Sequence, residues 1–126
     1  QKKIFEYHIQ LSEDLCKPLI IHQVKSLDEI FFYRKKYSPS QRWLIHGFRG
    51  NLLTAKLLLR AEIEFSFGNK FVPEILQIMP MKSLFLESDD SLCFSALLCK
   101  VAKILNKSEQ ELEQLLVENN HSFLNV

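Results

Sequence analysis

Two histidines stand where short apolar runs end, and an aspartate follows a third such run. His22 closes the run in "KPLIIHQVKS", residues 17–26, and His46 closes the run in "RWLIHGFRG", residues 42–50. Asp89 follows the apolar run in "LFLESDDS", residues 84–91. Imidazoles and carboxylates are ligands for zinc, manganese and similar divalent ions. These residues therefore suggest a metal site that lowers the pKa of a bound water to about 7, with Asp89 as a general base.

Such widely separated ligands can meet only if neighbouring strands of one sheet carry them. Short runs that are apolar on both faces, joined by helical segments, indicate a parallel α/β sheet. We expect strands at residues 18–22, 42–48, 62–68 and 82–89, and helices at residues 4–16, 27–37, 51–61, 73–79, 94–105 and 108–120. Ligands bind at the carboxyl edge of such sheets. The polar residues expected at that edge are His22, His46, Ser66 with Gly68, and Asp89.

The helix boundaries and faces also leave signals in the sequence. Ser26 with Glu29 and Ser108 with Glu111 have the spacing of capping boxes, which start helices. In the first helix, Phe5, Ile9 and Leu15 are expected roughly on one face. His8 and His121 lie on helical stretches without a partner pattern, so we interpret both as surface or packing residues.

The composition is that of an ordinary globular protein. The chain has 126 residues, 47% apolar and 25% charged, with a net charge of +1 that implies no general attraction to nucleic acid or membrane. Its three cysteines include no CxxC pair, which favours a reducing cytoplasm over a disulfide framework. No apolar run approaches the roughly 20 residues that span a bilayer, so we expect no membrane partner.

Each of these features has a simpler explanation when taken alone. A single histidine at a strand end is more often a hydrogen-bonded core or surface residue. The "ESDD" segment, residues 87–90, is more often a solvated turn that caps the next helix. The metal hypothesis therefore depends on the motifs occurring together.

The three motifs, in this order and spacing, resemble those of the TatD family of metal-dependent deoxyribonucleases and hydrolases. The family patterns read approximately K-P-(apolar)3-H, (apolar)2-H-x-F-x-G and L-(apolar)-L-E-[TS]-D, and this chain carries "KPLIIH", "LIHGFRG" and "LFLESD". "FSFGNKF", residues 65–71, is similar to the family's segment between the second and third motifs. "VENNHSFLNV", residues 117–126, is similar to its closing helix.

The resemblance implies that residues 1–126 form a single partial domain, the C-terminal half of a TIM-type (β/α)8 metal-dependent hydrolase barrel with an amidohydrolase-like site. The implied cofactors are divalent ions, Mg, Mn or Zn, two per site in the complete domain. The implied activity is that of a deoxyribonuclease or phosphodiesterase that uses a metal-activated water on DNA or another phosphoester. His22 and His46 would bind one metal, and Asp89 would bind the other and handle the attacking water. Arg49 would contact a substrate phosphate, and Glu87 would support the site through a hydrogen bond.

Two parts of the family pattern are absent from this chain. There is no H-x-H motif, and no strand-end Glu precedes Pro18. A complete barrel needs about 250 residues, or about 200 at the short end, so four strands would make only half of one. A half barrel exposes sheet edges that invite pairing. We therefore expect a truncated product, a chain completed by an N-terminal half, or a homodimer.

Two other functions stay open from the sequence. One is a catalytically degenerate α/β module that keeps the packing of the fold and serves in interactions; such a module would bind no metal through His22 and His46. The other is a related hydrolysis of a C–N bond, which would differ in substrate and not in its ligands.

Overall fold

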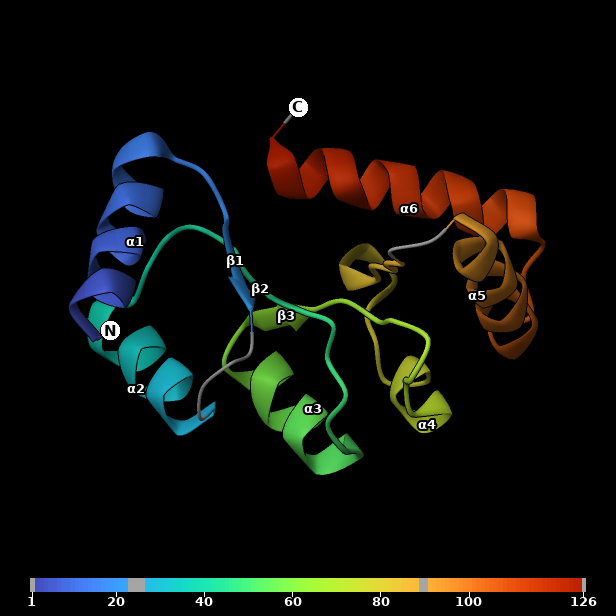
Figure 1. Ribbon diagram of the computed structural model, residues 1–126, viewed down its shortest axis with the longest axis horizontal. Helices are drawn as coiled ribbons and strands as arrows, with labels where there is room; N and C mark the ends of the chain where they lie inside the picture. The colour runs from blue at the N-terminus through green and yellow to red at the C-terminus, as the bar shows by residue number, and fades with distance from the viewer. Residues whose placement is uncertain (1, 23–26, 89–90, 126) are drawn as a thin grey trace.

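The computed structural model describes residues 2–22, 27–88 and 91–125, and helices and strands alternate along the chain (Figure 1). In order, the elements are α1 (Lys2–Leu15), β1 (Leu19–His22), α2 (Leu27–Tyr37), β2 (Trp43–His46), α3 (Leu52–Arg60), β3 (Ile63–Phe65), α4 (Pro73–Leu76), the 3-10 helix η1 (Met81–Ser83), α5 (Ser91–Ile104) and α6 (Glu109–Leu124).

The strands form a parallel sheet in the order β1-β2-β3. In the register, Leu19 lies opposite Trp43 and His22 lies opposite His46. On the other side of β2, Ile45 lies opposite Phe65. The sheet and its flanking helices confirm the parallel α/β class, and the three strands begin and end within a few residues of the predicted positions.

The predicted fourth strand, residues 82–89, is the main difference from expectation. Within the described part of this segment, pairing with the sheet is limited to one parallel bridge between Phe67 and Leu86. Residues 81–83 form η1 instead, and the side-chain amide of Asn119 donates to the carbonyls of Met81 and Leu84, at 2.7 and 2.9 Å. Because α6 satisfies these carbonyls, the segment reaches the sheet only near its end.

The two faces of the sheet pack against different layers. Ile21, Trp43 and Ile45 belong to the main core, together with buried residues of the helices. Leu44 alternates to the opposite face, where it forms a small second core with Phe85 and Phe123. Figure 1 shows α2 and α3 along one side of the strands and α6 across the other side. The sheet is therefore covered on both faces, although α6 covers its face only in part.

Helix boundaries followed the sequence signals more closely than helix faces did. The capping box of Ser108 and Glu111 is present at the start of α6. In the other capping-box pattern, Ser26 with Glu29, Ser26 lies outside the described residues. In α1, Ile9 is buried and Phe5 is half-buried, but Leu15 is 59% exposed. Leu15 is thus not buried with the other two residues expected on its face, because the helix ends there and the chain turns toward β1.

Among the described residues, no helix combines the length and apolar character needed to cross a membrane.

Candidate functional site

His22 and His46 lie side by side at the carboxyl edge of the sheet. They are the last residues of β1 and β2 and are opposite each other in the parallel register. Their ring centroids are 4.9 Å apart, with an angle of 53° between the ring planes. This separation matches the spacing of neighbouring strands, about 4.8 Å, because both rings stand on the same face of the sheet. Both residues are exposed to solvent.

Glu87 contacts the second of these imidazoles. Its Oε2 atom lies 2.6 Å from Nε2 of His46. The same oxygen accepts a 2.7 Å hydrogen bond from the hydroxyl of Ser66. That hydroxyl in turn accepts a 3.0 Å hydrogen bond from the backbone N–H of Gly47. The strand-end residues of β2 and β3 and the segment after Leu86 are therefore joined by one chain of hydrogen bonds.

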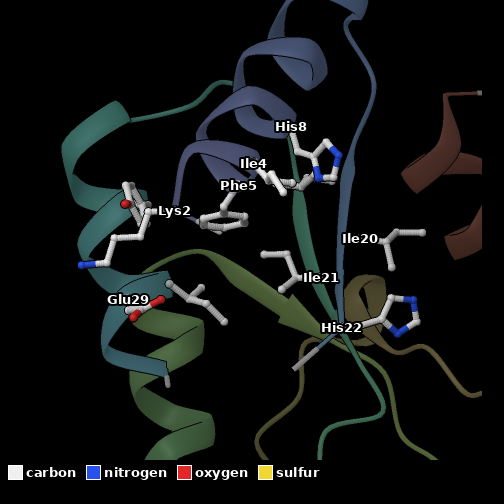
Figure 2. Close-up of a pocket in the computed structure, with 11 residues that line it drawn as sticks. Lys2, Ile4, Phe5, His8, Ile20, Ile21, His22 and Glu29 are labelled. Atoms are coloured by element: carbon white, nitrogen blue, oxygen red, sulfur yellow. The ribbon is translucent and has the colours of Figure 1, made fainter. Parts of the chain in front are cut away.

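A pocket of about 340 Å³ lies on the helix side of β1 (Figure 2). Its lining is largely apolar and comes from α1, β1 and α2. Ile20 and His22 are among the residues that line the pocket, although in Figure 2 their side chains point to the other side of the strand from that of Ile21. His22 therefore belongs to the imidazole pair and also borders this pocket.

The other predicted site residues are placed as follows. Arg49 is exposed on the loop after β2, three residues beyond His46 and at the same edge of the sheet. Ser66 is buried and takes part in the hydrogen-bond chain. Asp89, the predicted catalytic residue and metal ligand, lies outside the described residues.

The donors at this edge fit part of a divalent metal site. Two imidazoles with a neighbouring carboxylate have the chemistry that zinc or manganese requires. Within residues 2–22, 27–88 and 91–125, however, no group of three or more His, Cys, Asp or Glu side chains is arranged to hold an ion. The described residues therefore place two imidazoles side by side, and a metal site here would need further ligands.

Sequence reasoning missed the role of Gly47. Its backbone has φ of +68°, and a Cβ atom at this position would lie 2.9 Å from Oε1 of Glu87. The available signal was a glycine directly after a strand-end histidine, which often marks a left-handed turn or a close approach. It did not reveal which side chain approaches.

Comparison with known proteins identifies the family. Residues 1–125 match the family described as TatD related DNase. The chain belongs to this family.

Two relatives show how much of a family member the chain represents. An uncharacterised metal-dependent hydrolase of Buchnera aphidicola subsp. Baizongia pistaciae is 29% identical over 97 residues, which cover 71% of this chain and 37% of that protein. The crystal structure of YjjV, a TatD homologue from Escherichia coli K12, matches with a TM-score of 0.78 at 18% identity. This match covers 94% of this chain and 54% of that one. The chain thus has the fold of part of a TatD protein and spans about a third to a half of the length of these relatives.

Proposed function

We propose that this chain is part of a metal-dependent hydrolase that cleaves phosphodiester bonds, with DNA as the substrate. The observation that carries the proposal is the pairing of His22 and His46, 4.9 Å apart at the carboxyl edge, in a chain of the TatD related DNase family. The Buchnera relative is described as a metal-dependent hydrolase, which supports the hydrolytic class.

The residues would divide the work as their chemistry suggests. His22 and His46 would hold a divalent ion, Mg, Mn or Zn, through imidazole nitrogens, and Asp89 would add a carboxylate. When bound, such an ion polarises a phosphoryl oxygen and lowers the pKa of water to about 7. Asp89 would accept the proton of the attacking water as a general base. Arg49 would contact the phosphate oxygens with its planar guanidinium.

The test is cleavage of a fluorescent single-stranded DNA with Mg²⁺, with Mn²⁺ and with EDTA. Because the chain spans only part of the length of its relatives, each assay is run with the chain alone and with the N-terminal half of a relative added in trans. Removing a residue that hydrogen-bonds to a metal ligand lowers metal affinity or activity by about 10–100-fold. Removing a ligand itself should cost at least as much, so His22→Ala and His46→Ala should each lose at least that much activity. His121→Ala is the matched control, because His121 is exposed on α6 and takes no part in the site.

Activity that requires a metal and disappears in both site variants, but not in the control, would support the proposal. Absence of metal-dependent cleavage in both the isolated and the complemented chain would contradict it and favour a degenerate module. Full activity in either site variant with saturating metal would show that the ligand assignment is wrong.

A further inference from the structure

The side chain of Glu87 contacts a proposed metal ligand, His46, and is not itself one of the proposed ligands. Its Oε2 atom is shared between Nε2 of His46, at 2.6 Å, and the hydroxyl of Ser66, at 2.7 Å. We infer that Glu87 is a positioning residue that fixes the plane of the His46 imidazole, and that Ser66 and Gly47 hold Glu87 in place for this task. The inference rests on the proposed function, since an oriented imidazole is useful only where it binds something.

The backbone around Glu87 is anchored on the same side. The N–H of Glu87 donates to the carbonyl of Phe67 at 2.9 Å, and the N–H of Phe67 donates to the carbonyl of Phe85 at 2.8 Å. These two bonds flank the bridge between Phe67 and Leu86. The carboxylate is therefore fixed through its backbone as well as through Ser66, which makes it a rigid reference point for a neighbouring ring.

The contact with Glu87 restricts the orientation of the His46 ring, which has few other restraints. The backbone of His46 is fixed in β2, but its side chain is 42% exposed, compared with 23% for Glu87. An exposed imidazole at a strand end can turn about its side-chain torsions, which are broad at the ring. A carboxylate that accepts from one ring nitrogen removes this freedom and sets which nitrogen carries the proton.

Glycine at position 47 makes this contact possible. The backbone there has φ of +68°, and a Cβ atom would lie 2.9 Å from Oε1 of Glu87. The N–H of Gly47 also donates to the hydroxyl of Ser66. Because the Ser66 oxygen accepts from Gly47, its single proton is directed to Glu87. The glycine thus orients the serine as well as making room for the carboxylate.

A second carboxylate in the sheet provides a control. Glu64, in β3, accepts from the hydroxyl of Ser83 at 2.9 Å and from Nε of Arg42 at 2.8 Å. Like Glu87, it therefore accepts from a serine, but its second partner is the guanidinium of Arg42 rather than an imidazole. A variant at Glu64 loses comparable interactions without a contact to His46.

The experiment measures the imidazole nitrogens of the chain without metal. Long-range ¹H–¹⁵N spectra are recorded near neutral pH in EDTA for the wild type, Glu87→Ala, Glu87→Gln, Ser66→Ala and Glu64→Ala. The His46 signals are assigned by their loss in His46→Gln. We expect the wild type to show His46 in one tautomer, with Nε2 donating to Glu87. Glu87→Ala and Ser66→Ala should move the His46 signals toward the average of the two tautomers. Glu87→Gln, which keeps an acceptor oxygen, should restore much of the wild-type pattern, and Glu64→Ala should change nothing at His46.

Calorimetric titration with Mn²⁺ is the second readout, and Glu87→Ala should weaken binding by about 10–100-fold. Unchanged His46 signals in Glu87→Ala would overturn the inference. So would tighter Mn²⁺ binding in that variant, because the carboxylate would then compete with the ion for Nε2. If the wild type binds no Mn²⁺ and cleaves no DNA, the proposed function fails, while the spectra still decide whether Glu87 orients His46.

Discussion

At the residue scale, Gly47 connects backbone conformation to the candidate site. Gly47→Ala should destabilise the fold by about 1–2 kcal/mol, because a side chain with positive φ strains the backbone. It should also push Glu87 away from His46, because the new Cβ atom would lie 2.9 Å from Oε1 of Glu87. Urea unfolding measures the first effect, and the imidazole spectrum of His46 measures the second.

Gly68→Ala is the matched control for this substitution. A Cβ atom at Gly68 meets nothing within 4 Å, so this variant should keep both the stability and the His46 signals. If Gly47→Ala proved as stable as Gly68→Ala with an unchanged spectrum, the turn at Gly47 would not set the approach of Glu87.

Residue patterns predicted the neighbourhood of the two histidines but not its hydrogen bonds. Parallel strands end at one edge, so strand-end residues such as His22 and His46 can be expected to meet once the strands are recognised. The pairing of Ser66 with Glu87 depends on how a single bridge aligns two segments far apart in sequence. Local periodicity carries no information about that alignment. Asp89 lies outside the described residues, so its role stays a prediction.

At the element scale, Glu13 ties the end of α1 to the loop before β2. Its carboxylate accepts hydrogen bonds from the backbone N–H groups of Ser40 and Gln41 and from the hydroxyl of Ser40. Partial burial raises the pKa of Glu13, but these hydrogen bonds outweigh it, and the net pKa lies below its usual value. A carboxyl group whose pKa is lower in the folded state stabilises the fold above its unfolded pKa, and this stability is lost as the pH falls through the folded value.

Glu13→Gln should therefore lower the melting temperature near neutral pH. The difference from the wild type should shrink as the pH falls below the usual pKa of a glutamate and through the lower pKa of Glu13 in the folded state. Thermal unfolding followed by circular dichroism across this range provides the measurement. Asp14→Asn is the control on the same helix, because Asp14 is exposed and its carboxylate accepts a hydrogen bond from Gln10, one turn earlier in α1. A constant difference between Glu13→Gln and the wild type at all pH values would contradict the linkage.

Elements whose signals are local were predicted best. The capping box of Ser108 and Glu111 works within one turn of helix, and α6 begins where it predicts. The prediction of a fourth strand at residues 82–89 was wrong for the opposite reason. The same apolar alternation occurs in a strand and in an irregular segment that packs against a helix. The side-chain amide of Asn119 donates hydrogen bonds to the carbonyls of Met81 and Leu84, which lie more than thirty residues earlier in the sequence. A pattern read in a short window cannot register such a partner.

At the scale of the whole molecule, an apolar face of α1 is left uncovered beside an edge strand. In the described part of the chain, β1 pairs with β2 alone. The exposed apolar residues of α1 follow a helical spacing of three and four, and they are Ile4, Tyr7, Leu11 and Leu15. An unpaired strand edge next to such a stripe favours association with another polypeptide. The relatives extend well beyond the matched region, since this chain covers 37% of one and 54% of the other.

We therefore predict that the isolated chain self-associates as its concentration rises, unless a complementing N-terminal half covers the same face. Light scattering coupled to size-exclusion chromatography should give a mass above that of the monomer. Tyr7→Glu with Leu11→Glu places two charges one turn apart on the stripe and should restore the monomer. Leu53→Glu with Leu57→Glu has the same spacing on α3, where the leucines are exposed but lie away from β1, and should leave the association intact. A monomeric wild type at every concentration would contradict the prediction. Equal dissociation by both pairs would show that exposed apolar surface in general, rather than the face beside β1, holds the copies together.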